Sequence, residues 1–215
     1  MNDEEIIEKV SKRADLNPFL AKIKRHDKEL YTHCKNVAII SEYIASRLNF
    51  TEEEVEEIAA GALIHDVGKI FIDLSILKAP RCLYNREFKA IKKHPTYGYE
   101  MCRDFGFSET ILEIIRDHHE NENGLGYPRK KTKMSKEVQI VSVADKYDAM
   151  TSVRPYKVKF SNKKALMEIS KFCEGISYGK EIYGVLKKYS DESDNVYELL
   201  KEDKKDIEST QILAV

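Results

Sequence analysis

The sequence predicts an all-α fold, and three observations carry this prediction. Apolar residues recur at helical spacing along most of the chain, and several of these runs follow a residue that can cap a helix. No run of alternating apolar and polar residues flanked by hairpin turns interrupts them. At 215 residues the chain is long enough for one main domain with a substantial core, or for such a domain and a short helical appendage.

The first long helix is expected from about Lys28 to Leu48. Its apolar stripe, which is wide enough to bury one face, consists of Leu30, Cys34, Val37, Ile44 and Leu48. Glu29 and His33 lie beside this stripe. Because they are four positions apart, a helix places both side chains on the same face, within reach of one metal region.

The second helix has a clear start signal. Thr51 can cap the free backbone amides, and Glu54, three residues later, can reach back to complete a capping box. The helix is expected to run through Leu63 and Ile64 toward His65.

Serines begin the next two helices. Ser108 is expected to cap a helix from Glu109 to about Glu120, and Ser135 opens a helix that includes Val138 to about Met150. Between them, residues 121–133 contain two glycines and a proline without apolar periodicity, which predicts a loop. After Pro155 we expect two or more helices rich in Lys and Glu, with a frayed end over the last dozen residues.

Composition excludes several classes of function. Lys and Arg (36) nearly balance Asp and Glu (37), so the net charge of −1 gives no electrostatic reason to bind a nucleic-acid polymer or a membrane surface. An anionic substrate must therefore be held by a local cluster of cations. The longest apolar stretches, such as Ile58 to Ile64, fall far short of the roughly 18 residues that a membrane span needs.

The four cysteines give no sign of a disulfide framework. They form no CxxC pair, and the chain has no signal-peptide pattern; they are Cys34, Cys82, Cys102 and Cys173. We expect reduced thiols, most of them packing residues, in a soluble, cytoplasmic protein.

The distribution of histidine is the main chemical signal. Five of the six histidines lie at or near predicted helix ends or next to acidic residues. Imidazole combined with carboxylate suits divalent iron, manganese or zinc, whereas the absence of a cysteine ligand pattern argues against a structural zinc site. The candidate ligands are Glu29, His33, His65, Asp66, His94, His118, His119 and Asp145.

Adjacent candidates favour a site with at least two metals. Neighbouring positions on a helix point in different directions, so Asp66 can bridge two ions while His65 binds one. By the same reasoning His118 and His119 serve two metals more naturally than one. Two ions about 3.5 to 4 Å apart activate a water and stabilise both oxygens of a displacement at phosphorus, which makes phosphodiester hydrolysis the natural reaction.

Each of these features has an ordinary structural explanation when taken alone. A single His-Asp dipeptide occurs by chance, and His33 on the flank of an amphipathic helix is often a packed or half-exposed residue. His26 has no companion, and we expect it at the surface. The joint pattern is difficult to explain as packing or solvation, and it favours the metal site.

From about Glu29 to Tyr156, the sequence resembles the HD-GYP family of bacterial phosphodiesterases. The resemblance is carried by His65-Asp66-Val67-Gly68-Lys69, His94 with Gly98, His118-His119-Glu120, Asn123-Gly124-Leu125-Gly126-Tyr127-Pro128, Ala144-Asp145 and Thr151 to Tyr156. It implies an HD-domain helical bundle with extra C-terminal helices. It also implies that metal-activated hydroxide hydrolyses cyclic di-GMP to pGpG, GMP or both.

The resemblance assigns roles to individual residues. It implies two or three divalent ions, iron or manganese, held by the ligands named above, with Glu29 supporting a third ion. Asp66 and Lys69 take the catalytic positions. The substrate contacts are Lys69, Tyr127, Arg154 and Lys157. The structural alternatives are that Lys69 is an ordinary exposed lysine and that Tyr127 is a turn aromatic that closes the core.

The expected organisation is a short N-terminal helical extension (1–27), an HD-GYP catalytic domain (28–200) and a frayed C-terminal tail (201–215). Members of the family commonly follow a sensory or receiver domain, and fewer than thirty residues precede Glu29. We therefore expect that activity is regulated by a protein partner or a homodimer, is regulated by substrate supply, or is not regulated. The family's usual Asp-Gly is here Asn123-Gly124, and Asn tolerates the same turn conformations. The basic run Arg129 to Lys133 is expected to be a solvated loop.

Three other functions compete with cyclic di-GMP hydrolysis. The first keeps the metals but acts on another cyclic dinucleotide, such as cyclic GMP-AMP, or on a nucleotide. The second is a module that binds the dinucleotide without hydrolysing it, but its expected mark is the loss of metal ligands, and none is lost here. The third is a di-iron oxygenase, against which the cations Lys69, Arg154 and Lys157 argue because they suit phosphate.

Overall fold

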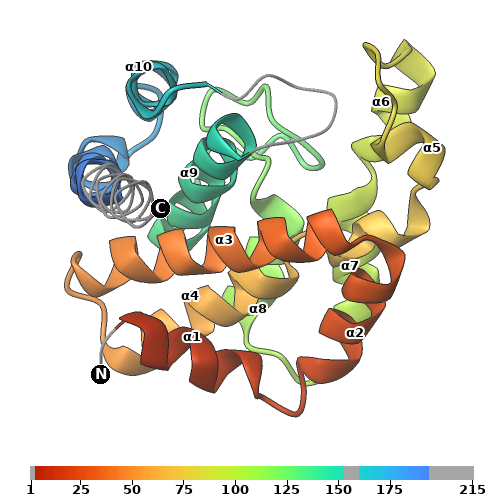
Figure 1. Ribbon diagram of the computed structural model, residues 1–215, viewed down its shortest axis with the longest axis horizontal. Coiled ribbons are helices and arrows are strands. Elements are labelled where there is room, and N and C mark those ends of the chain that lie inside the picture. The colour runs from red at the N-terminus through yellow and green to blue at the C-terminus, as the bar shows by residue number, and fades with distance from the viewer. Residues whose placement is uncertain (1–2, 153–159, 194–215) are drawn as a thin grey trace, which may run out of the picture.

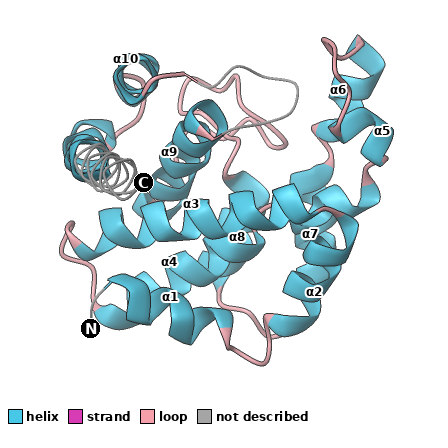
Figure 2. Ribbon diagram, viewed as in Figure 1, coloured by secondary structure: helices cyan, strands magenta, loops and turns pink. Residues whose placement is uncertain are grey.

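The computed structural model describes residues 3–152 and 160–193. Within these ranges every regular element is a helix and no strand occurs, as Figure 2 shows. The all-α prediction is confirmed. The helices are α1 (Asp3–Ser11), α2 (Asn17–His26), α3 (Lys28–Ser46), α4 (Glu52–Ile64), the short 3-10 helix η1 (Val67–Phe71), α5 (Leu74–Leu77), α6 (Asn85–Ile91), α7 (His94–Cys102), α8 (Glu109–Asp117), α9 (Lys136–Thr151) and α10 (Asn162–Cys173), and residues 179–193 form a further helix.

Helices α3, α4, α8 and α9 form the centre of the bundle. Figure 1 shows α3 running across the molecule, and it packs against α4 and α9, while α4 packs against α8. The second half of α4 is a run of fully buried apolar residues, among them Ile58 and Leu63. A Cβ at Gly61 would lie 2.8 Å from the Ile114 side chain, so the glycine lets α4 and α8 approach closely. Burial on all sides explains why this half of α4 lacks a polar face.

Local capping explains where the helices begin. The capping box between Thr51 and Glu54 is present, and Ser108 and Ser135 each accept a hydrogen bond from a backbone N–H in the first turn of their helices. The first long helix extends from Lys28 to Ser46, two residues short of the expected end. The helix after Ser108 ends at Asp117 rather than near Glu120, because the chain turns there into the irregular segment predicted for residues 121–133.

The ends of the chain contribute to the same core. Buried residues of α1 and α2, including Val10 and Phe19, belong to the hydrophobic cluster that α3 and α4 form. At the other end, Ile182 and Leu186 of the helix 179–193 are fully buried in it. By contrast, α5 and α6 project from the body of the molecule, and neither has a buried residue (Figure 1).

The four cysteines are free thiols, as expected. Cys34, Cys102 and Cys173 are buried, and Cys82 is exposed. His26, expected at the surface, is half-buried at the end of α2. Across the two described ranges, none of the helices combines the length and apolar character that crossing a bilayer requires.

Candidate metal centre

The candidate ligands come from distant parts of the chain and meet inside the bundle. His33 lies on α3, His65 follows the last residue of α4, and His94 begins α7. His118 follows α8, and Asp145 lies on α9. Because these helices pack on one another, their ends and inner faces bring imidazoles and carboxylates into one buried region.

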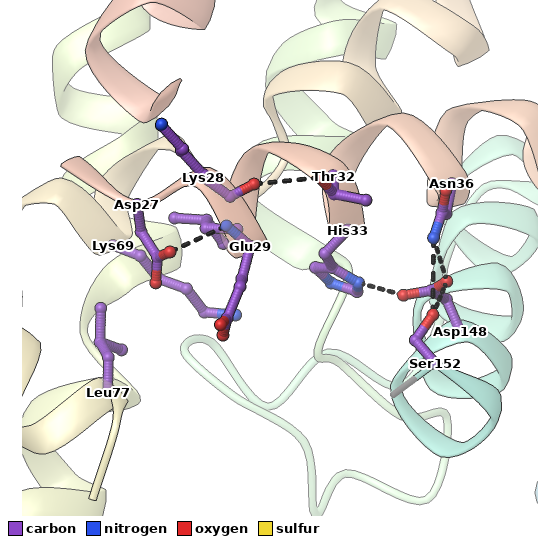
Figure 3. Close-up of a pocket in the computed structure, with 11 residues that line it drawn as sticks. Asp27, Lys28, Glu29, Thr32, His33, Asn36, Lys69, Leu77, Asp148 and Ser152 are labelled. Atoms are coloured by element: carbon purple, nitrogen blue, oxygen red, sulfur yellow. Dashed lines mark hydrogen bonds and ion pairs between the residues drawn. The ribbon is translucent and has the colours of Figure 1, made fainter. Parts of the chain in front are cut away.

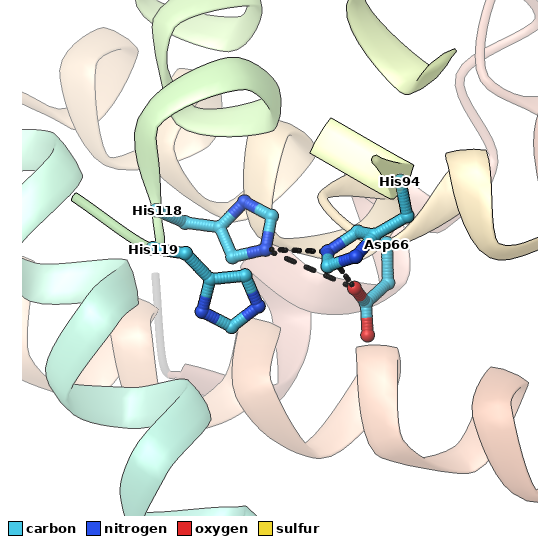
Figure 4. Close-up of side chains that lie close together, drawn as sticks. All are labelled: Asp66, His94, His118 and His119. Atoms are coloured by element: carbon cyan, nitrogen blue, oxygen red, sulfur yellow. Dashed lines mark hydrogen bonds and ion pairs between the residues drawn. The ribbon is translucent and has the colours of Figure 1, made fainter. Parts of the chain in front are cut away.

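The ligand atoms form two groups that share one carboxylate. In each group they lie within 4.8 Å of one another. We name them half-site A, which comprises His33, His65 and Asp66, and half-site B, which comprises Asp66, His94, His118 and His119 (Figure 4). His118 and His119 therefore face one half-site, contrary to the expectation that they serve two metals. His118 is the C-cap of α8 and keeps a helical backbone, but His119 lies beyond it, where the directions of consecutive helical positions no longer apply.

Asp66 lies between the half-sites. Its Oδ1 is 3.0 Å from His94 Nε2, and its Oδ2 is 3.4 Å from His65 Nε2 and 3.6 Å from His33 Nε2. The side chain is fully buried. Burial opposes its ionisation, but Lys69, His65 and His94 outweigh it and hold the pKa of Asp66 well below its usual value. One ionised carboxylate thus presents one oxygen to each half-site, as a bridging ligand requires.

Asp145 is a second carboxylate that reaches both half-sites. Its Oδ1 is 3.1 Å from His33 Nε2, and its Oδ2 is 3.9 Å from His119 Nδ1. Burial again opposes ionisation, and His33 together with the nearby His119 holds the pKa of Asp145 well below its usual value. Two buried anions among imidazoles create a strong preference for a cation.

Backbone carbonyls set the tautomer of three histidines. The Nδ1 of His65 is 2.7 Å from Ala62 O, and the Nδ1 of His94 is 2.8 Å from Ile91 O. The Nδ1 of His118 is 3.1 Å from two carbonyls of α8. A carbonyl can only accept a hydrogen bond, so each Nδ1 carries a proton, and the tautomer that this contact selects directs the lone pair of Nε2 into the site.

These lone pairs fit a metal ion and no protein donor. His94 Nε2 and His118 Nε2 are 3.2 Å apart, and neither has a proton to share. Burial lowers the pKa of His94, and burial with the neighbouring His65 and His94 lowers the pKa of His118, so both rings are neutral at pH 7. His65 Nε2 and Asp66 Oδ1 are buried and have no hydrogen-bond partner among the residues that the structure describes. Cations at these positions would satisfy all four atoms.

A cavity of about 370 Å³ opens beside half-site A. Figure 3 shows Glu29, His33, Lys69 and Asp148 on its wall. Lys69, on η1, donates a hydrogen bond to Asp66 Oδ2. Burial opposes the charge on Lys69, but Asp66 and Asp145 outweigh it and raise the pKa of the ammonium above its usual value. Lys69 is therefore a permanent cation at the junction of cavity and ligands, and the alternative of an ordinary exposed lysine is wrong.

Glu29 stands apart from the two half-sites. It is exposed on the cavity wall and belongs to neither group of ligand atoms. Arg154 and Lys157 lie outside the described residues.

Tyr127 covers half-site B. Its ring stacks on that of His119, with centroids 4.7 Å apart and planes inclined by 30°. The Lys92 ammonium lies 4.9 Å from the centroid of the Tyr127 ring. The aromatic ring thus lies between a candidate metal ligand and a cation, where it can contact a ligand as well as close the core.

Buried acids hold the loop that carries Tyr127. Asp117, fully buried, accepts hydrogen bonds from the Arg129 guanidinium and the Lys131 ammonium. The Glu120 carboxylate accepts hydrogen bonds from the backbone N–H groups of Arg129 and Lys131. The expectation of a solvated basic run is therefore wrong for Lys131, which is half-buried, whereas Arg129 is exposed and still pairs with the buried Asp117.

Two residues beside the site were missed by the sequence reasoning. Lys92 precedes His94 by two positions, and the sequence contains no signal that it lies beside Tyr127. Asp148 lies one helical turn after Asp145, and its Oδ2 is 2.6 Å from His33 Nδ1. That one-turn spacing is a signal that could have identified it.

Comparison with known proteins adds independent evidence. The family model described as HD domain matches residues 30–150. A cyclic di-GMP phosphodiesterase of Thermotoga maritima is 35% identical over 184 residues, which are 82% of this chain and 49% of that protein. A 3'3'-cGAMP-specific phosphodiesterase of Vibrio cholerae is 31% identical over 136 residues, which are 62% of this chain and 30% of that protein. The chain thus spans half or less of the length of these curated relatives.

A solved structure supports the same fold. The HD domain of the L. monocytogenes phosphodiesterase PgpH superimposes with a TM-score of 0.60 at 17% identity, covering 84% of this chain and 99% of that one. At this identity the likeness concerns the fold alone. The family model, which matches more than half of the chain, shows that the chain belongs to the HD domain family, and the matched cyclic di-GMP phosphodiesterases agree with its resemblance to HD-GYP proteins.

Proposed function

We propose that the chain is a metal-dependent phosphodiesterase that hydrolyses cyclic di-GMP to pGpG, GMP or both. The observation that carries the proposal is the pair of half-sites joined by the buried carboxylate of Asp66, beside a cavity whose wall includes the Lys69 cation. The activity that names the Thermotoga maritima relative supports the choice of substrate. Hydrolysis breaks the bond between phosphorus and a ribose 3′ oxygen, which leaves with a proton, while the water oxygen stays on phosphorus.

The chain's own residues would divide the work. Two divalent ions, iron or manganese, would be held by the residues of half-sites A and B, with Asp145 beside them. Glu29 on the cavity wall would support a third ion. When bound, such ions lower the pKa of a water and offset the charge on phosphate. Lys69 would neutralise a phosphate oxygen, and Tyr127 would contact a base or phosphate. Arg154 and Lys157, by resemblance, would clamp the second phosphate.

The wider organisation follows from the same proposal. Residues 28–200 would form the catalytic domain, residues 1–27 would extend its helical core, and residues 201–215 would be the C-terminal tail. The protein would act in the cytoplasm, where the dinucleotide is found, without binding a membrane or a nucleic-acid polymer. A protein partner or a homodimer would regulate it.

The decisive test uses the full chain, purified without oxygen and loaded with Fe²⁺ or Mn²⁺. It should convert cyclic di-GMP to pGpG or GMP, detected by chromatography. Asp66→Ala and His118→Ala should lower the rate by more than about 100-fold, because even the partners of metal ligands are worth about 10- to 100-fold. His26→Gln, a histidine variant outside the half-sites, should retain the rate. Absence of turnover with either metal would refute the proposal.

Cyclic GMP-AMP is the second substrate to test in the same experiment. The Vibrio cholerae relative named for 3'3'-cGAMP favours cyclic GMP-AMP as the alternative, since both dinucleotides present the same phosphates. A panel of cyclic di-GMP, cyclic GMP-AMP and mononucleotides would rank them by kcat/KM. A higher value for cyclic GMP-AMP would change the substrate, and comparable values for mononucleotides would remove the dinucleotide claim.

A further inference from the structure

His33 differs from three other buried histidines in what holds its second ring nitrogen. The Nδ1 atoms of His65, His94 and His118 face backbone carbonyls, which are neutral. The Nδ1 of His33 instead lies 2.6 Å from a carboxylate oxygen, Oδ2 of Asp148 (Figure 3). An anionic partner attracts the Nδ1 proton more strongly, and it makes Nε2 on the opposite side of the ring a better electron-pair donor.

The Asp148 carboxylate is itself fixed in place. It is 3% exposed. Its Oδ1 accepts hydrogen bonds from Asn36 Nδ2 at 2.9 Å and from Ser152 Oγ at 2.6 Å, as Figure 3 shows. These two donors occupy one carboxylate oxygen and leave the other to His33. The carboxylate therefore cannot rotate away without breaking buried hydrogen bonds.

These contacts between α3 and α9 involve two residues of each helix, one turn apart. His33 and Asn36 lie three positions apart on α3, and Asp145 and Asp148 lie three positions apart on α9. His33 Nε2 meets Asp145 Oδ1 at 3.1 Å, and the same ring meets Asp148 through its other nitrogen. The imidazole is thus held between two carboxylates of one helix, and this arrangement determines where Nε2 points.

We propose that Asp148 is a positioning residue for half-site A. It holds His33 as the Nδ1–H tautomer, aims Nε2 at the position between Asp66 and Asp145, and strengthens Nε2 as a metal ligand. Asn36 and Ser152 hold Asp148 for this task. The proposal rests on the proposed function only in requiring that half-site A binds a metal ion. It extends that function by distinguishing the histidines: His33 of half-site A depends on a carboxylate outside the ligand set, whereas His65, His94 and His118 depend on backbone carbonyls.

The competing explanation is that Asp148 merely joins α3 to α9. In that case its loss would lower the stability of the fold, and any effect on metal binding would fall on both half-sites alike. A positioning role affects half-site A alone. Counting the ions in each half-site therefore separates the two explanations without measuring activity.

The experiment compares the full chain with Asp148→Ala, Asp148→Asn and the control Tyr147→Phe. Tyr147 neighbours Asp148 on α9, and its hydroxyl donates a hydrogen bond to Ser190 at 3.0 Å, so the control also removes one buried hydrogen bond. Each protein is loaded anaerobically with ⁵⁷Fe²⁺ and challenged with a chelator. Iron per chain and the Mössbauer spectrum, which resolves the two iron environments, are then recorded, and circular dichroism monitors folding.

The expected result is selective weakening at one iron position. Asp148→Ala should lower the affinity of half-site A by about 10- to 100-fold, the usual cost of losing a partner of a metal-bound histidine, while half-site B keeps its ion. Asp148→Asn keeps an acceptor for Nδ1–H, so it should fall between wild type and Asp148→Ala. If Asp148→Ala does not fold, the iron content of Asp148→Asn tests the proposal. Tyr147→Phe should retain both ions.

Two outcomes would overturn the inference in distinguishable ways. If the wild-type chain binds iron in both half-sites and folded Asp148 variants retain it equally, or lose both ions together, Asp148 has no positioning role and the proposed function is untouched. If the wild-type chain binds no iron, the metal premise of the proposed function fails, and the inference fails with it.

Discussion

At the scale of single residues, Gly68 shows how close backbone contact builds the site. A Cβ at this position would lie 2.0 Å from the carbonyl oxygen of His94 and 2.5 Å from the backbone nitrogen of Gly98. The backbones of η1 and α7 therefore touch, which places Asp66 beside His94. Gly68→Ala must push the two segments apart. We expect a loss of about 1–3 kcal/mol in the free energy of unfolding, measured in urea, and weaker binding in half-site B.

The matched control is Gly184→Ala. Gly184 lies in the helix 179–193, is exposed, and would bring its new Cβ within 4 Å of no atom. Alanine favours a helix over glycine by up to about 1 kcal/mol, so this variant should be as stable as wild type or more stable. Equal unfolding midpoints for both alanine variants would contradict the account of Gly68.

Thiol reactivity is also decided residue by residue. Burial raises the pKa of Cys102 and of Cys173 to about 12, and burial raises the pKa of Cys34 well above its usual value. A raised pKa keeps the thiol protonated, and only the thiolate reacts. Native protein treated with iodoacetamide should therefore be alkylated at the exposed Cys82 alone at pH 8, and still at pH 9. Peptide mass spectrometry identifies the alkylated residues. In denaturant, as a control, all four cysteines should react. Alkylation of Cys102 in the native protein at the same rate as Cys82 would contradict the prediction.

At the scale of elements, the segment 121–133 is tied to the end of α8 by buried charge. Arg129→Ala leaves the buried Asp117 with the Lys131 ammonium and the Arg116 guanidinium, 3.2 and 3.5 Å away, as remaining cations. Because Arg129 is partly exposed, we expect a loss of only about 1–2 kcal/mol in stability. The loop itself should loosen, so hydrogen exchange over residues 121–133 should be faster. The KM for cyclic di-GMP should rise because Tyr127 is displaced.

Lys133→Ala is the control for this change. It removes the same charge from the same loop, but Lys133 is exposed. Hydrogen exchange, followed by mass spectrometry, should be unchanged in this variant. If both variants accelerate exchange equally, the loop is held by its net charge and not by the contact between Arg129 and Asp117.

At the scale of the whole molecule, metal binding should couple to folding. The candidate ligands extend from His33 to Asp145 and join helices that the unfolded chain leaves far apart. An ion that binds only the folded state stabilises it by about 2.7 kcal/mol at 100 times Kd. For a chain of this length that corresponds to a rise of about 5–10 °C in Tm.

Thermal unfolding with saturating Mn²⁺, and again with EDTA, measures this shift. The chelator should reverse the rise. Asp66→Ala, which removes the carboxylate common to both half-sites, should show little response to Mn²⁺. An unchanged Tm of the wild-type chain at saturating metal would mean that the half-sites do not hold ions in the folded state.

The sequence by itself determined the helical class, the starts of α3, α4, α8 and α9, and which residue types are available to hold a metal. Caps such as Thr51 with Glu54, and Ser108, act within one turn, so their signals are readable along the chain. The motif His65-Asp66 and the pair His118-His119 predict a metal site from residue type and adjacency alone. These features depend on neighbours in sequence.

Only the tertiary structure decided which groups meet. Asp148 holds a histidine 115 positions away, Lys69 faces inward onto Asp66, and Arg129 folds back on the buried Asp117. Likewise, His118 and His119 share half-site B because α8 ends before His119. Such pairings depend on how helices pack and where the chain turns between them, and periodicity within a single helix carries no information about the partner across the core.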